Sequence, residues 1–194
     1  MAISYPLALP THTRISQISL TAGNAVAYSQ SPFTFAGQAH AYAGQMWQAD
    51  VTLPPMRRTD AEQWVAWLVS LRGQLGSFLL GDPTNCSPRG TATAATISGS
   101  AGDNSVSVVM TGTLLAGDYL QLGSGATATL HKVLQDQSGD GTLEIWPALR
   151  SDQSSASADL SSAQGRFRLA TNETSWSIDN ASVYGISFSA MEKI

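Results

Sequence analysis

The sequence has few charged residues. Asp, Glu, Lys and Arg make up 12% of its 194 residues, about half of the roughly 25% that is usual in globular domains. The hydrophobic fraction of 43% is ordinary, so Gly, Ala, Ser and Thr replace charge and much of the exterior must be neutral. Because charge is depleted from the cores of protein interfaces, this composition favours a protein that packs against neighbours. A weakly charged soluble monomer also fits it.

Cysteine and long apolar runs are scarce as well. The single cysteine, Cys86, excludes an internal disulfide, so the fold cannot depend on an oxidising compartment. No uninterrupted apolar run approaches the roughly 18 residues that span a membrane. The net charge is −4 and Arg57-Arg58 is the one basic cluster, which gives no support for nucleic-acid binding. We expect a soluble protein made in a cytoplasm that binds neither nucleic acid nor membrane.

Groups for catalysis or metal binding are few. The histidines are His12, His40 and His131, and no zinc-protease motif, Cys/His metal spacing, nucleophile elbow or phosphate-binding loop accompanies them. His131 alternates with apolar neighbours, which favours a hydrogen-bonded sheet histidine over a ligand. Cys86 follows Asn85 in a loop with no basic partner nearby in sequence, so we interpret it as a bystander thiol. The sequence therefore predicts a protein that is not an enzyme and carries no cofactor or metal.

One segment imitates a calcium site. Residues 136–141 read Asp-Gln-Ser-Gly-Asp-Gly, with oxygen ligands at the first, third and fifth positions and glycine at the sixth. The twelfth position should be a bidentate Glu but is Pro147, and no helix pattern flanks it. A polar hairpin turn is therefore the favoured interpretation.

The first ninety residues show mainly strand patterns. Alternation of apolar and polar residues is clearest over residues 47–53 and ends at Pro54-Pro55. An earlier strand is predicted around Val26 and Tyr28, and another around Phe33 and Phe35.

One helix follows these strands. Thr59 to Glu62 form a capping-box pattern, in which Thr59 is the N-cap and Glu62 bonds back to it. Arg72 suits the negative end of the helix dipole, and Gly73 suits the left-handed position after the helix. The apolar face of the helix consists of Ala61, Trp64, Val65, Leu68 and Leu71, with Trp67 widening it. We expect the helix to cover one face or end of the sheet.

The middle of the chain differs from its flanks. Residues 91–165 hold only two of the aromatic residues, Tyr119 and Trp146. Short strand patterns at 105–110, 119–122, 126–134 and 142–146, separated by turns, predict a small barrel or sandwich. Residues 151–164 are rich in Ser, Ala and Asp and are interpreted as a loop or tether. Aromatic character returns from Arg166.

These patterns predict an all-β fold with one flanking α-helix and two parts. Residues 1–84 and 166–194 form a discontinuous β-sandwich body, and residues 85–165 form an inserted small β-barrel. In this interpretation the chain leaves the body at Gly81-Asp82-Pro83 and returns at Arg166.

Two roles are open for the rings of the inserted barrel. Tyr119 and Trp146 could form a platform that stacks a sugar, with Asp118 and Glu144 beside them. Alternatively a barrel of this size needs both rings for its own core, which is the interpretation we favour.

A longer stretch resembles a known family. Residues 46–83, "MWQADVTLPPMRRTDAEQWVAWLVSLRGQLGSFLLGDP", are similar to the N-terminal body of distal tail proteins, minor tail proteins of long-tailed siphophage-type bacteriophages. Those proteins pair a Trp-bearing strand with a helix built around A-x-x-W-x-x-W/F-L, followed by an R-G-x-x-G-x-F-L-L-G-D-P hairpin. The phrases "LLAGDYLQLG", "EIWPALR" and "RFRLATNETSW" lie where the same proteins often carry related ones.

The resemblance implies a function that composition alone would not indicate. It implies a virion structural protein that forms a ring, usually a hexamer, at the distal end of the tail. Such a ring joins the tail tube protein to the hub or tail-tip proteins of the baseplate. The family's inserted or appended β-domain is sometimes OB-like. We therefore expect a homo-oligomeric adaptor at the virion tail tip. The alternative is a carbohydrate- or receptor-binding β-module active in host attachment, and a tail-associated hydrolase ranks last for want of a nucleophile and base.

Overall fold

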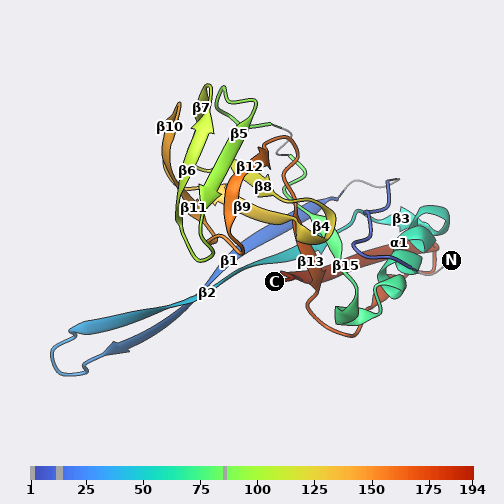
Figure 1. Cartoon of the computed structure of the whole chain (residues 1–194). Coiled ribbons are helices and arrows are strands. Elements are labelled where there is room, and N and C mark those ends of the chain that lie inside the picture. Colours follow the sequence, from blue (N-terminus) through green and yellow to red (C-terminus); the bar gives the residue numbers. More distant parts are fainter. Residues whose placement is uncertain (1–2, 12–14, 85–86) are drawn as a thin grey trace.

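The computed structural model describes residues 3–11, 15–84 and 87–194. Strands predominate, one α-helix occurs among the described residues, and six strands close into a barrel (Figure 1). The predicted fold class is therefore confirmed. The elements are β1(Gln17–Gln30), β2(Gly37–Thr52), β3(Met56–Arg57), α1(Arg58–Ser70), η1(Gly73–Leu75), β4(Phe78–Leu80), β5(Ala95–Gly99), β6(Ser105–Met110), β7(Thr113–Leu114), β8(Tyr119–Leu122), η2(Gly125–Thr127), β9(Thr129–Val133), β10(Gln137–Ser138), β11(Gly141–Trp146), β12(Gln153–Asp159), β13(Gly165–Leu169), β14(Trp176–Ile178) and β15(Val183–Glu192).

The large sheet is built from both ends of the chain. Its strand order is β1-β2-β15-β13-β4, and β3 and β14 pair with β15 as well. β15 changes partners along its length: residues near its start pair with β14 and β3, and Ser187–Met191 pair with β2. The alternation predicted over residues 47–53 is confirmed, because Trp47, Ala49, Val51 and Leu53 are all buried.

Helix α1 packs its apolar face onto this sheet. Trp64 and Trp67 contact each other at a centroid distance of 5.5 Å, and Trp67 meets Phe78 of β4 at 5.0 Å. Phe188 of β15 joins the same cluster of rings. Trp67 Nε1 donates to the carbonyl of Ala8 at 2.8 Å, so this indole also holds the N-terminal segment in place.

The predicted ends of the helix are wrong. The helix starts at Arg58, its N-cap is Arg57, and no side chain caps it. Glu62 does not bond back to the cap; it accepts a hydrogen bond from the Tyr184 hydroxyl at 3.2 Å. At the other end the helix stops at Ser70. Arg72 takes the left-handed conformation directly after the C-cap, with φ 53°, and Gly73 is left-handed as predicted, with φ 66°.

The barrel strands run in the order β11-β6-β5-β12-β8-β9 and enclose an apolar core of their own. The strand predictions for this region are confirmed at β6, β8, β9 and β11. The prediction of a loop over residues 151–164 is wrong, because β12 lies there and pairs with β5 and β8. Its inward positions are small alanines, Ala156 and Ala158, so the sequence shows no strong hydrophobic alternation.

In the sequence, all six barrel strands lie between two residues that pair with each other in the large sheet. Leu80, the last residue of β4, pairs with Gly165, the first residue of β13. A Cβ on Gly81 would lie 2.1 Å from the carbonyl oxygen of Ala163, so the outgoing and returning segments touch there. Whether residues 85–165 fold as an independent domain stays a prediction.

A further correction concerns the first two strands. The strand predicted at Phe33 and Phe35 is wrong, because both residues lie in the turn between β1 and β2. The two strands form one antiparallel hairpin that pairs from Gln17–Thr52 at one end to Gln30–Gly37 at the other.

Substituting Trp64 tests the packing of the helix on the sheet. This side chain is 1% exposed, so Trp64→Ala should lower the free energy of unfolding by about 3–5 kcal/mol. Val69→Ala is the matched control, because Val69 lies on the exposed side of the same helix and its loss should change stability by less than about 0.5 kcal/mol. Chemical denaturation of both variants measures the difference, and equal stabilities would contradict the packing described.

Candidate assembly surface

The β1–β2 hairpin extends far beyond the rest of the sheet. Residues 22–46, here called the arm, project away from both the barrel and helix α1 (Figure 1). β15 pairs with β2 only from Gln48 to Thr52, so the arm is a two-stranded ribbon. Isolated two-stranded hairpins are at best marginally stable in water. The arm therefore needs support that this chain supplies only at its base.

The arm carries no charge. Residues 15–49 contain no Asp, Glu, Lys or Arg, although exposed strand edges are normally protected from pairing by charged side chains. Instead the arm exposes five large apolar side chains: Val26, Tyr28, Phe33, Phe35 and Tyr42. Sequence reasoning missed this surface, yet the uncharged run of residues was the signal that could have found it.

The two faces of the arm differ in polarity. Residues directly opposite each other on paired strands share a face, and Val26 pairs with Ala41 and Tyr28 with Ala39. This face is apolar. The opposite face carries Ser29 with Gln38 and Ala27 with His40, and the Tyr42 ring lies against His40 on this face. The arm thus presents an apolar side that no described residue of this chain covers.

A bulge marks the base of the arm. Asn24 pairs with Gln45, but Val26 pairs with Ala41, so three residues of β2 stand opposite Ala25. Bulges of this kind bend a strand and change its twist. The direction of the arm therefore depends on how this base is held.

The barrel holds the base through three aromatic rings. Trp47 of β2 meets Trp146 of the barrel edge-on, with 4.5 Å between ring centroids, and Tyr119 lies at 6.1 Å. The Trp47 Nε1 donates to the carbonyl of Leu130 at 2.9 Å. The Trp146 Nε1 donates to the Asn24 side chain at 2.7 Å. Two strands of the large sheet, β1 and β2, and three strands of the barrel, β8, β9 and β11, thus meet at this junction.

This arrangement places the two residues considered for sugar stacking. Tyr119 is 7% exposed and Trp146 is 9% exposed, so neither ring offers a free face to a sugar. They also lie outside the barrel's own core and belong to the cluster around Trp47. Asp118 does not form a platform beside them, because it is buried and its carboxylate accepts the Arg89 and Gly90 amides at 3.0 and 3.4 Å. Tyr119 and Trp146 instead join the barrel to the large sheet.

A charged pair reinforces the same junction. Arg150 donates from Nη2 to Glu192 at 2.8 Å and to the backbone carbonyl of Gln45 at 2.6 Å. The Glu192 carboxylate also accepts the Trp47 amide at 3.0 Å. The Gln45 side chain accepts the Ala148 amide at 2.7 Å. Because both charges are largely buried, removing either would leave its partner unpaired, which is costly inside a protein.

His131 supports this junction from within the barrel. Its ring is fully buried, and it donates from Nδ1 to the carbonyl of Pro147 at 2.8 Å and accepts at Nε2 from the Thr129 hydroxyl at 2.9 Å. The pKa of His131 is lowered from 6.5 to about 4, mainly by burial; the bond to Pro147 opposes the shift and the nearby Arg150 adds to it. The neutral ring is therefore the folded form, as predicted for a sheet histidine.

Several carboxylates of the barrel region bind backbone amides. Burial acts to raise the pKa of Asp118, but bonds from the amides of Leu115, Arg89 and Gly90 and from the Arg89 guanidinium outweigh it, so the pKa lies below its ordinary value. In the calcium-like segment, Asp136 accepts the Ala116 amide at 2.7 Å. Within this segment Gln137 and Ser138 form β10, and residues 139–140 connect it to β11. No group of three metal-binding side chains occurs among the described residues.

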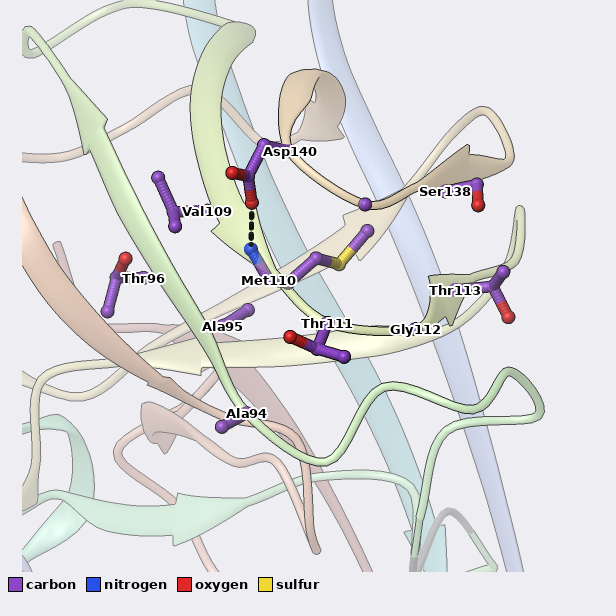
Figure 2. Close-up of a pocket in the computed structure, with 11 residues that line it drawn as sticks. Ala94, Ala95, Thr96, Val109, Met110, Thr111, Gly112, Thr113, Ser138 and Asp140 are labelled. Carbon is purple, nitrogen blue, oxygen red and sulfur yellow. Dashed lines mark hydrogen bonds between the residues drawn. The ribbon is translucent and has the colours of Figure 1, made fainter.

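The barrel also has a shallow groove of about 730 Å³ next to this turn. Figure 2 shows its lining of small and neutral side chains, among them Ala94, Thr96 and Val109. Asp140 is the one charged residue of the lining, and its carboxylate accepts the Met110 amide at 2.8 Å. A single engaged carboxylate is not a set of groups for acid–base chemistry.

Other sequence predictions have separate outcomes. Cys86 and His12 lie outside the described residues. His40 lies on the arm, where its ring meets Tyr42 edge-on at 4.8 Å. Within the described parts of the chain, no helix is both long and apolar enough to cross a membrane.

Comparison with known proteins adds no relative: no protein-family profile matches the chain, and no curated protein does.

The pKa of His131 predicts how stability changes with pH. Because the folded pKa of about 4 is below the unfolded value of 6.5, the unfolded chain takes up the proton first as pH falls. The free energy of unfolding should therefore fall by about 3 kcal/mol between pH 6.5 and pH 4 on account of this residue. His131→Asn should show a smaller loss over that interval in denaturant titrations. His40→Asn, on the exposed arm, is the control for the loss of a histidine, because it leaves the buried His131 ring in place. A pH profile of His131→Asn identical to that of the parent would contradict the assignment.

Proposed function

We propose that the protein is a structural virion protein: a homo-oligomeric adaptor at the distal end of a phage tail. In this proposal it connects the tail tube protein to the hub or tail-tip proteins and has no reaction to catalyse. The observation that carries the proposal is the arm, an uncharged two-stranded ribbon whose apolar face has no partner among the described residues of its own chain.

The physical reason for assembly is the state of the arm in a monomer. Its open edges and exposed rings are features that natural proteins suppress when they must stay separate. Four aromatic residues of the arm, Tyr28, Phe33, Phe35 and Tyr42, are more than half exposed. Covering them would remove roughly 400–700 Å² from water. A standard interface buries about 800 Å² per partner, so the arm can supply most of one.

The resemblance of residues 46–83 to distal tail proteins supports a location in the phage tail. It implies a hexameric ring in the virion. A ring requires two different surfaces that meet head to tail and close after a fixed rotation. The junction around Trp47 would serve such a ring by holding the arm at one angle to the barrel. A carbohydrate- or receptor-binding role would need a surface other than the buried rings of Tyr119 and Trp146.

Two substitutions on neighbouring residues of the arm test the proposal. Ala39→Glu puts a charge on the apolar face, and Gln38→Glu puts the same charge on the polar face. We expect the parent protein to form a closed oligomer in light scattering behind size exclusion. Ala39→Glu should lower the association constant roughly tenfold to a hundredfold, because a buried unpaired charge is disfavoured, whereas Gln38→Glu should assemble as the parent does.

The location in the virion needs its own measurement. A phage particle that carries a tagged copy of this protein should show the label at the distal end of the tail by electron microscopy. Label at the capsid, or none in the particle, would contradict the adaptor role even if the pure protein assembles.

A further inference from the structure

The turn at the end of the arm displays two phenylalanine rings. Phe33 is 91% exposed and Phe35 is 74% exposed. Phe35 has φ 56°, a left-handed conformation that costs free energy for a bulky side chain and is normal for glycine or asparagine. A residue held in such a conformation, away from any core, points to a role for the ring itself.

Hydrogen bonds order the backbone of the turn that carries these rings. The Ser31 amide donates to Ala36 and the Phe35 amide to Ser31, each at 3.0 Å. The Gln30 side chain donates to the carbonyl of Phe35 at 2.9 Å. A turn that is already ordered loses little conformational entropy when it binds. Docking of the tip would therefore cost little conformational entropy.

A groove that could accept such a ring lies at the base of the same arm. It measures about 370 Å³, and an apolar cavity of about 150 Å³ already admits a benzene ring. Small and apolar residues line it together with three amide side chains: Gly23, Ala25, Gly44, Met46, Ile194, Asn24, Gln45 and Gln48. None of its lining side chains is charged, so it matches the uncharged tip.

The tip of a chain cannot reach its own groove. Gly23 and Ser31 are separated along an extended strand at about 3.3 Å per residue, which places the turn roughly 25 Å from the base. The arm would have to fold back on itself and break the pairing of β1 with β2. The groove is therefore open only to the tip of another molecule.

We propose that Phe33 and Phe35 at the arm tip of one copy occupy the arm-base groove of a second copy of this chain. The inference rests on the proposed function in that it requires copies to assemble. The second copy is favoured as the occupant because one chain carries both halves of the contact. The neighbour would then cover the tip rings Phe33 and Phe35 together with Tyr28 on the apolar side of the arm, which supply most of the area estimated above. Tip and base are different surfaces, so repeated contacts close a ring when the rotation permits it.

Two variants separate the halves of the contact. Phe35→Gly removes a ring and relieves the left-handed strain, so the fold should keep or gain stability. Ala25→Leu fills the groove and leaves the tip intact. Sedimentation velocity should show association weakened roughly tenfold to a hundredfold for each variant alone. Leu134→Ala is the control, because Leu134 is an exposed apolar residue of the barrel region and should assemble as the parent does.

Mixing the two variants gives the decisive result. Phe35→Gly keeps an open groove and Ala25→Leu keeps both rings. The mixture should therefore form a one-to-one heterodimer at concentrations where each variant by itself stays monomeric. Thermal unfolding of each variant checks that both remain folded. If both variants assemble as the parent does, or the mixture forms no heterodimer, the inference is wrong while assembly by another surface stands. A parent protein that stays monomeric at its highest soluble concentration also overturns it, and the labelled phage particle then decides the proposed function separately.

Discussion

The contact of Trp47 with Trp146 fixes the relation between the two parts of this molecule. Trp47 belongs to the strand that continues into the arm, and Trp146 belongs to the barrel. Their rings meet at 4.5 Å, and the buried pair of Arg150 and Glu192 binds the same stretch of backbone. Because the hydrogen bond from Trp146 reaches Asn24 at the bulge, the barrel determines where the arm leaves the sheet and in which direction it points.

This constraint explains how a ribbon of two strands can project from a folded domain. The arm is anchored at one end by side chains that are almost fully buried, and its turn is ordered by its own hydrogen bonds. Between these points it lacks the third strand or packed face that would stabilise it in water. Under the proposed assembly, the contacts that the arm lacks in its own chain would be apolar and uncharged, as in the core of an interface. In this account, the contacts that assemble the protein are also the contacts that stabilise the arm.

Local patterns in the sequence predicted local structure well. The alternation over residues 47–53 and the apolar face containing Trp64 and Leu68 are confirmed, because period and burial determine both. The helix caps were mispredicted, since tertiary contacts of Glu62 with Tyr184 compete with the capping box. β12 was missed because alanines fill its inward positions. The junction could not be predicted, because Asn24, Trp47 and Trp146 are far apart in the chain and no periodicity links them. The arm was overlooked because the turn containing Phe33 resembles a strand by composition.

Hydrogen–deuterium exchange of the arm tests the central claim most directly. Amides of residues 26–30 and 38–41 should exchange quickly in a dilute sample and become protected as concentration raises the mass in solution. Amides of the barrel core, such as those of β6, should exchange equally in both samples, because the barrel is already folded. An oligomer whose arm exchanges as fast as that of the monomer would contradict the account, since its copies would then be held together by another surface.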